Sequence, residues 1–519
     1  MHNFRFKNSF KFDLNNKSNI FFLLAFFILF FQIIIFFIAD KHSFFLINDS
    51  YGYYFTEAKN IYRQGSIHDI SKLILDLYFD QIKLANYDLT QTKPYHFPIY
   101  SSYLSIFFHL TDNEFLIIAL SQFFPCLIML YFSHLILINY ISSNKSLSII
   151  ILAFLCSPIV IFTCDSNAEL FSGSLIILSF YLSLFANKRN GLSYYFVYFL
   201  VNSILFLRIK FLVIFSILCL VYRILPIKFT EENKKIEIKN IFFLLIFSII
   251  LPSLISYYAY NHLNWHFLES HDFKNLFFFN SENLSITIYQ ILSRNTWYFA
   301  IFLTFLIGIY FYFQEIVKIF SLRKISKILV IYSCGFILFI SLLVFYTPDG
   351  YRMLISFYPF VFLLIYDNFK KLNFVNKNLF MTKTFTILIL IIFVYNNFLI
   401  IKFSSNHQHK IIEKTEILKK IMSQYDAKNV VIDLDFFEKF FRLPFMHLLS
   451  QDRHVLMVWK YKDSICELLS EYAKNGLKFE LLILSNNLEK RCEFVAKNYH
   501  IKTNIYQELN EDLMLYLKK

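Results

Sequence analysis

The strongest constraint on the fold of this chain is a series of long apolar runs. The first, residues 20–39, is interrupted only by Gln32. At about 1.5 Å per residue it is long enough to cross a hydrocarbon layer of roughly 30 Å. Further runs follow at residues 115–140, 147–163, 170–186, 194–207, 211–225, 241–260, 297–313, 328–345, 354–366 and 385–401. The sequence therefore predicts an α-helical polytopic membrane protein with about 11 transmembrane helices.

The distribution of basic residues predicts the orientation of these spans. The net charge is +13, and membrane proteins keep their excess Lys and Arg in cytoplasmic loops. Basic residues gather in alternate loops, at residues 188–189, 223–239, 318–327 and 370–383. We therefore expect a multi-pass protein of a bacterial inner or plasma membrane, with a cytoplasmic N-terminus and no nucleic-acid partner. With an odd number of spans, the C-terminus lies outside.

The sequence divides into two parts. Residues 1–403 form the predicted membrane domain, whose first outer loop covers about residues 40–114. Residues 404–519 are more polar, and short apolar strands are expected at residues 430–434, 454–458 and 479–484, with helices at 409–424, 462–474 and 487–498. This alternation predicts a small extracytoplasmic α/β domain. Its spacing allows a disulfide between Cys466 and Cys492.

Ionisable residues from at least five segments converge on the predicted outer face of the membrane. Charged groups near spans usually pair with one another or line a pathway. Carboxylates together with guanidinium groups suit a transfer in which a hydroxyl loses its proton while a phosphate leaves. The residues in question are Asp49, Glu57, Arg63, Asp80, His96, Asp165, Glu169, Arg208, Lys210, Asp349 and Arg352.

Each candidate also has a purely structural interpretation. Asp49 and Asp165 could cap the helices that follow them. The basic residues Arg208, Lys210 and Arg352 could mark span ends by reaching toward the interface. His96 could be a structural loop residue. A metal site built from residues 262–271, which contain three His and one Glu, is the weaker alternative because the HExxH order is missing.

Several motifs resemble those of GT-C class integral membrane glycosyltransferases, especially protein mannosyltransferases and the aminoarabinose transferase of lipid A. The first outer loop carries NDSYGYYFTEAKNIYRQG and PYHFPIYSSYLSIFF, and Asp49, Tyr53 and Ala58 match the family pattern D-x-x-x-Y-x-x-x-A with one extra residue before Ala58. Further similar segments are SPIVIFTCDSNAELFSGSLIIL, LRIKFLVIF, in which Ile209 replaces the usual Pro, and YTPDGYRMLISFYPFVFLLI.

The resemblance implies inverting transfer of a sugar from a polyprenyl-phosphate carrier to a lipid, glycan or protein acceptor. Asp49 would be the catalytic base, and Tyr53 and His96 would line the substrate pocket. Donor phosphate would bind Arg208, Lys210 and Arg352. The acidic positions Asp165 and Glu169 would orient the acceptor or hold a divalent cation, which is the cofactor that this arrangement allows.

Three other functions are compatible with parts of the sequence. A glycan polymerase or ligase would use lipid-diphosphate-linked glycans, but its key loop would come late in the chain. A transporter would show paired repeats and Gly- or Pro-broken helices, whereas this chain has only 8 glycines. A binding or scaffold role, with an inactive membrane part, is the third alternative.

Overall fold

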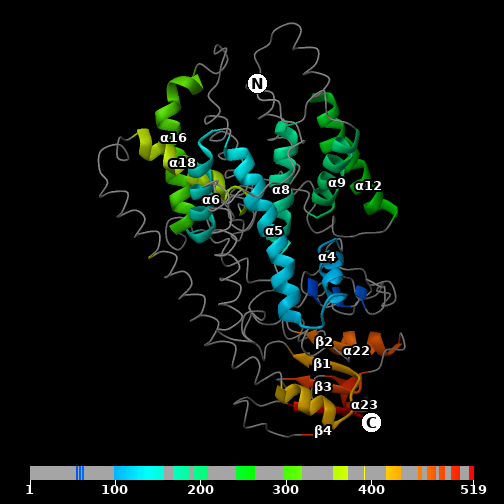
Figure 1. The fold of residues 1–519 in the computed structure, drawn as a ribbon. Coiled ribbons are helices and arrows are strands. Elements are labelled where there is room, and N and C mark those ends of the chain that lie inside the picture. Colours follow the sequence, from blue (N-terminus) through cyan, green and yellow to red (C-terminus); the bar gives the residue numbers. More distant parts are fainter. Residues whose placement is uncertain are drawn as a thin grey trace.

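The structure is a helical bundle with a mixed β-sheet beyond one of its ends (Figure 1). The computed structural model describes residues 54–55, 58–59, 61–62, 99–138, 140–156, 168–185, 192–208, 241–262, 296–317, 355–371, 391, 416–433, 454–458, 465–474, 479–484, 492–502 and 514–519.

The helices of the bundle coincide with many of the predicted spans. They are α4 (Ile99–Phe108), α5 (Glu114–Leu137), α6 (Ser143–Cys156), α8 (Ala168–Phe185), α9 (Leu192–Arg208), α12 (Leu251–His262) with the preceding π-helical turn η6 (Ile246–Ile250), α16 (Thr296–Val317) and α18 (Tyr358–Lys371). Within the described residues, Leu116–Leu137 and Ile241–Ala259 are long and apolar enough to cross a membrane. Shorter apolar helical stretches there are Ile99–Phe108, Lys145–Phe154, Ala168–Ser183, Ser193–Leu207 and Leu303–Phe313. The total of about eleven spans stays a prediction.

Side-chain contacts establish how α5, α8 and α9 run. Tyr103 of α4 stacks on Phe171 near the start of α8 and donates to the carbonyl of Ser121 near the start of α5. Phe132 and Tyr181 meet further along the same two helices, with ring centroids 4.9 Å apart, so α5 and α8 run parallel. Helix α9 runs antiparallel to α8. The hydroxyl of Tyr194, near the start of α9, donates to the carbonyl of Leu182 near the end of α8, and the hydroxyl of Ser179, earlier in α8, donates to Asn202 Oδ1, later in α9. We call the end of the bundle at which α5 and α8 begin and α9 ends the α4 end.

Helix α18 begins later than the predicted span at residues 354–366. Residues Ile355 to Phe357 form a tight turn, and the α-helix runs from Tyr358 to Lys371. Pro359 lies in the first turn of the helix, where the missing N–H costs no hydrogen bond. The far end of α18 is joined to α16 by two hydrogen bonds: Tyr312 Oη donates to Asp367 Oδ2 (3.0 Å), and Asn368 Nδ2 donates to the carbonyl of Thr304 (3.1 Å).

The sheet confirms the three predicted strands and adds two. Its order is β2-β1-β3-β5-β4, from β1 (Asn429–Asp433), β2 (His454–Val458), β3 (Leu481–Leu484), β4 (Tyr499–Lys502) and β5 (Met514–Lys518). Strands β1, β2 and β3 are parallel, whereas β5 is antiparallel to both β3 and β4. The sheet of the predicted α/β unit is therefore mixed. Its boundary at residue 404 lies outside the described residues and stays a prediction.

Helices α22 (Ile465–Lys474) and α23 (Glu493–Asn498) are joined by a disulfide between Cys466 and Cys492. The predicted pairing of these two cysteines is thus present in the structure. The helix expected at residues 487–498 begins only at Glu493, because Cys492 is extended, with φ −133° and ψ 96°. The helix expected at residues 409–424 is described over residues 416–424.

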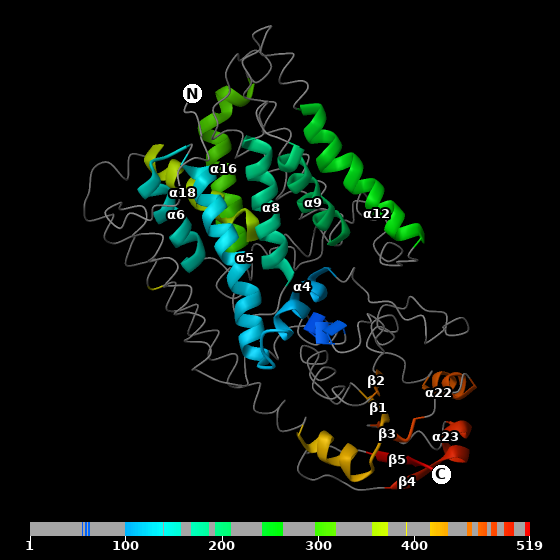
Figure 2. The same cartoon turned by 45° about the vertical axis from the view of Figure 1, so that its right-hand side comes forward.

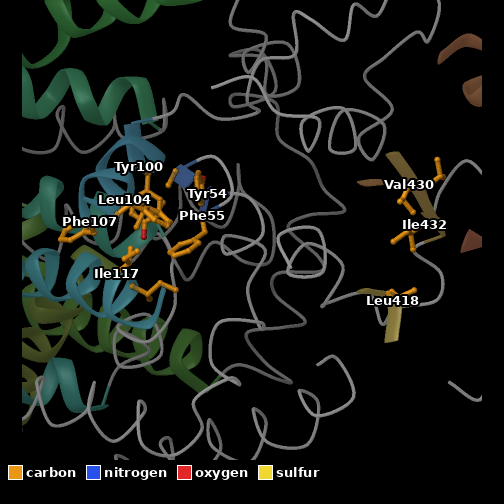
Figure 3. Close-up of a cluster of buried hydrophobic side chains, with 14 of the residues drawn as sticks. Tyr54, Phe55, Tyr100, Leu104, Phe107, Ile117, Leu418, Val430 and Ile432 are labelled. Atoms are coloured by element: carbon orange, nitrogen blue, oxygen red, sulfur yellow. The ribbon is translucent and has the colours of Figure 1, made fainter. Parts of the chain in front are cut away.

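The sheet lies beyond the α4 end in the view of Figure 1 and also in the turned view (Figure 2). Buried apolar side chains form two groups in the close-up (Figure 3). One surrounds α4 and includes Tyr54, Phe55, Tyr100, Leu104 and Phe107; the other contains Leu418, Val430 and Ile432 of the sheet unit. The two groups belong to the two parts of the chain that the composition distinguishes.

Candidate active site at the α4 end of the bundle

Three segments that are far apart in the sequence meet through aromatic rings at the α4 end. Tyr54 lies edge-on to Tyr100, with ring centroids 5.1 Å apart. Tyr100 in turn lies 5.6 Å from Phe171, which also stacks on Tyr103 at 4.8 Å. Offset and edge-to-face pairs of this kind add to the stabilisation from burial. The first-loop segment, α4 and the start of α8 are therefore packed as one unit.

The described part of the first loop is anchored along the whole length of α4. Phe55 packs against Phe108 (5.1 Å), and Tyr62 stacks on the same ring at 5.7 Å while lying edge-on to His109. Phe55 is fully buried. Ala58, Lys59, Ile61 and Tyr62 of this segment are helical.

A buried amide adds polarity to the aromatic unit. Gln122 in α5 is fully buried, and its Nε2 donates to Tyr100 Oη at 2.7 Å. Its Oε1 has no hydrogen-bond partner among the described residues. The bond fixes the Tyr100 ring between Tyr54 and Phe171, because a buried hydroxyl that keeps its partner has few alternative positions.

Glu169 places an acidic group at the start of α8. It is the second residue of the helix, where a negative charge interacts favourably with the helix dipole. Its side chain is 9% exposed, so it is buried two residues before Phe171 of the aromatic unit. The other predicted acidic residue of this junction, Asp165, lies outside the described residues.

Helix α9 brings a basic position to the same end. Its last residue is Arg208, and α9 contacts both α4 and α8. Because the two helices are antiparallel, with Ser179 opposite Asn202, the last turn of α9 lies level with the second turn of α8. Lys210 lies outside the described residues.

Helix α18 approaches α8 at a glycine. A Cβ added to Gly173 would lie 2.5 Å from Ile355 Cγ2 and 3.6 Å from the backbone nitrogen of Ser356. Further along, Phe180 and Phe360 meet with centroids 5.8 Å apart. The turn that opens α18 therefore lies directly against the second turn of α8. Arg352, three residues before Ile355, lies outside the described residues.

The structure describes only some of the predicted site residues, and their roles stay predictions. Glu169 and the backbone of Arg208 lie at the same end of the bundle. Asp49, Tyr53 and His96 lie outside the described residues. Sequence reasoning missed the roles of Tyr54, Tyr100, Gln122, Phe171 and Gly173. Two of these carry a signal: Gln122 is the only amide in α5, and glycine is rare in this chain.

The described residues hold no group of three or more His, Cys, Asp and Glu side chains that could bind a metal ion. His262 is the last residue of α12, and the remaining members of the predicted histidine-rich loop lie outside the described residues. The divalent cation that the sequence allows therefore stays a prediction.

Comparison with known proteins identifies the fold. No protein-family model and no curated protein sequence matches this chain. Among solved structures, ArnT from Cupriavidus metallidurans bound to undecaprenyl phosphate is similar over 95% of this chain and 97% of that chain, with a TM-score of 0.52 and 10% identity. Its apo state gives a TM-score of 0.53 over the same shares of the two chains, also at 10% identity.

The oligosaccharyltransferase of Archaeoglobus fulgidus in the apo form is similar over 91% of this chain and 70% of that chain, with a TM-score of 0.54 and 10% identity. Both neighbours are integral membrane GT-C proteins. The resemblance to this class is confirmed at the level of the fold, which this chain shares with ArnT and with the oligosaccharyltransferase.

Proposed function

We propose that this chain is a membrane glycosyltransferase that moves a sugar from a polyprenyl-phosphate carrier to an acceptor at the outer face of the membrane. One observation carries the proposal. The first-loop segment, α4 and the start of α8 with its buried Glu169 are packed together at one end of a GT-C fold. The same fold in ArnT from Cupriavidus metallidurans has been solved with undecaprenyl phosphate bound.

Asp49, Tyr53, His96, Asp165, Lys210 and Arg352 lie outside the described residues. Their membership of the proposed site rests on the resemblance of the sequence motifs.

The proposed reaction is a single inverting displacement. The oxygen of the acceptor hydroxyl bonds to the anomeric carbon of the sugar, and the bond from that carbon to the carrier phosphate breaks. The hydroxyl proton passes to the carboxylate of Asp49, which acts as general base. Arg208, Lys210 and Arg352 stabilise the negative charge on the departing phosphate. Glu169 and Asp165 orient the acceptor or hold a divalent cation.

The same proposal assigns an orientation to the chain. The α4 end faces the outside, with the first outer loop at about residues 40–114, and the N-terminus is cytoplasmic. Residues 404–519 form an extracytoplasmic domain on the same side. The Cys466–Cys492 disulfide supports this side, because disulfides persist in oxidising compartments. The lipid tail of the carrier would lie in the bilayer beside the bundle.

The decisive experiment replaces the proposed base. In vesicles supplied with a sugar linked to a polyprenyl phosphate, we expect Asp49→Asn to abolish transfer, because the amide cannot accept the proton. The matched control is Asp112→Asn, an exposed acid between α4 and α5, which should keep full activity. Full activity in Asp49→Asn would contradict the assignment. Transfer only from a lipid diphosphate would favour the polymerase or ligase alternative.

A second experiment tests the basic residues. We expect Arg352→Ala to weaken donor binding by about 10-fold or more, because it removes a charge-assisted contact to phosphate. Acceptor KM should change little. The control is Lys145→Ala, whose ammonium lies 5.9 Å from the Tyr366 ring in α18, away from the α4 end. Unchanged donor affinity in Arg352→Ala would remove Arg352 from the phosphate site.

A further inference from the structure

We infer that the π-helical turn η6 and the proline that follows it, Pro252, form a hinge at which α12 moves relative to α9. The helical residues 241–245 lie on one side of this hinge and α12 lies on the other. The inference does not rest on the proposed function, because the movement takes place without donor or acceptor. It gives a conformational role to a helix that carries none of the predicted catalytic or phosphate-binding residues.

The backbone hydrogen bonds change their pattern at η6. The N–H of Leu251 bonds to the carbonyl of Ile246, five residues back, whereas an α-helix bonds four residues back. Pro252 has no N–H, so it cannot donate to the carbonyl of Ser248, which is its α-helical acceptor. Sharp bends in helices occur at prolines and at π-helical turns. The weakest point of this helix therefore lies between residues 246 and 252.

The part of the helix before the hinge is anchored to α9 by aromatic rings. Tyr195 contacts Phe243 at 5.7 Å and Phe247 at 5.8 Å between ring centroids. Phe199, one turn further along α9, also contacts Phe247, at 6.3 Å. Leu244 is fully buried beside these rings in the sequence. Because large aromatic pairs contribute beyond their burial, we expect this part of the helix to stay on α9.

Helix α12 has a weaker hold on α9. Among its described side chains, only those of Pro252 and Ala259 are buried, and both are small. Leu254, Tyr257 and Tyr258 are 57%, 67% and 61% exposed. The two views show α12 on the outer side of α9, at the edge of the bundle (Figures 1 and 2). Segments with few buried apolar contacts open most easily, so α12 is the part that moves.

A buried hydroxyl at the hinge favours the movement. Ser248 lies within η6 and is fully buried, yet its Oγ has no hydrogen-bond partner among the described residues. A buried polar group without a partner costs free energy. Movement of α12 that brings water or another polar group to Ser248 would reduce this cost. The closed position of α12 is therefore only weakly preferred.

The movement reaches the α4 end of the bundle. The helix that contains η6 runs parallel to α9, because Tyr195 meets Phe243 and the later Phe199 meets the later Phe247. Since α9 ends at the α4 end, α12 extends toward the same end beside the last turns of α9. When α12 moves away, residues 204–208 of α9 should become more accessible together with residues 251–262.

The experiment measures hydrogen–deuterium exchange of the full-length protein in lipid nanodiscs, without donor or acceptor. Pro252→Ala supplies the missing N–H and a better helix former, so exchange of residues 251–262 should slow by about 10-fold. Ala259→Leu enlarges a side chain in the contact with α9, so exchange of residues 251–262 and 204–208 should rise by about threefold or more. Residues 241–245 should exchange as in the wild type in Ala259→Leu.

Pro125→Ala is the matched control. Pro125 lies inside α5, which stays α-helical through this residue. Contacts hold α5 on both sides of it: Tyr103 donates to the carbonyl of Ser121, and Phe132 meets Tyr181 of α8. Pro125→Ala should therefore leave the exchange of residues 251–262 unchanged.

Opposite effects of Pro252→Ala and Ala259→Leu on residues 251–262 would support the hinge. Exchange in Pro252→Ala equal to that of the wild type, or an equally large change in Pro125→Ala, would overturn it. If Pro252→Ala does not fold, Ala259→Leu decides alone, and unaltered exchange of residues 251–262 in that variant would overturn the inference. The measurement contains no transfer step, so its failure would leave the proposed function intact, and the absence of transfer would leave the hinge intact.

Discussion

The α4 end of the bundle and the C-terminal sheet use similar residues in different ways. Each buries a tyrosine hydroxyl and places a glutamate near backbone groups. In the sheet, Glu480 Oε2 accepts hydrogen bonds from the backbone N–H groups of Lys428 and Asn429 (3.2 Å to Asn429), which fixes the start of β1. At the α4 end, Glu169 is buried beside rings that come from three separate segments.

This difference indicates that the two regions have different roles. The polar side chains Glu480 and Tyr499 of the sheet unit bond to backbone groups, and its helices α22 and α23 are joined by a disulfide, which is typical of a stabilised structural unit. At the α4 end, the side-chain contacts hold together segments that are far apart in the sequence. We therefore expect changes at the α4 end to act on transfer activity, and changes in the sheet to act on stability.

Among the changes that compare these two regions, the largest effect is expected from Glu169. We expect Glu169→Gln to lower transfer by about 10³-fold, equivalent to about 4 kcal/mol, because a charged group that acts on the reactants is lost. Glu480→Gln should leave transfer unchanged and instead speed hydrogen exchange in β1. The measurements are transfer in vesicles and hydrogen–deuterium exchange of the same preparations. Equal activity losses in both variants would remove the distinction between the two regions.

The disulfide should give the next largest effect. Replacing both Cys466 and Cys492 by Ala opens a loop with a sequence separation of 26, which is expected to cost about 3 kcal/mol of stability. Hydrogen exchange in β1 and β3 should become about 100-fold faster, while transfer at low temperature persists. The control is Cys126→Ala, a buried free cysteine in α5. Exchange that is unaltered by the double replacement would show that the disulfide does not stabilise the sheet.

A smaller effect is expected from Tyr100→Phe. The change keeps the ring contacts with Tyr54 and Phe171 but removes the acceptor for Gln122 Nε2, and an unsatisfied buried donor costs about 1–3 kcal/mol. The temperature of thermal unfolding should fall accordingly, and transfer activity should fall by less than about tenfold. Adding Gln122→Leu should restore most of the lost stability, since both polar partners are then apolar. If stability does not recover, the hydrogen bond between Gln122 and Tyr100 does not account for the loss.

The smallest effect at neutral pH is expected from Tyr499→Phe, which removes the hydrogen bond from Tyr499 Oη to the carbonyl of Phe479 (3.0 Å) and costs about 1 kcal/mol. Burial raises the pKa of the Tyr499 phenol to about 12. The folded state therefore holds the proton longer than the unfolded state, whose pKa is about 10. Stability should fall as the pH rises from about 10 to about 12.

In Tyr499→Phe this decline should be less steep, because the titrating group is absent. Hydrogen exchange of β3 and β4 at several pH values in that range measures the effect. An identical slope in the variant and the wild type would show that Tyr499 does not couple to the unfolding of the sheet.

The elements that the sequence predicts well are those with continuous apolar runs. The runs at residues 115–140 and 241–260 are found as helices, and the strands at residues 430–434, 454–458 and 479–484 as β1, β2 and β3. Strands β4 and β5 were missed because YHIK and MLYLK are short and mix charged with apolar residues. Their strand structure depends on pairing with each other, which a local pattern does not contain.

The candidate site was predictable only in part, for a similar reason. The acidic and basic positions carry a signal of their own, since ionisable residues near spans stand out against apolar surroundings. The aromatic unit does not, because the chain contains 68 Phe and 35 Tyr residues and nothing in the sequence distinguishes Tyr100 or Phe171 from the others. The role of Gly173 depends on which atom faces it, and only the packed structure supplies Ile355.

The position of β5 in the sheet has a consequence for biosynthesis. Strand β5 comes last in sequence among the five strands, yet it lies between β3 and β4 and supplies the partner of β4. The five-stranded sheet can be completed only after residues 514–518 have left the ribosome and reached the compartment in which the unit folds. Until then β3 exposes an open edge, which is a hazard for aggregation. A chaperone that shields this edge during synthesis would therefore raise the yield of folded protein.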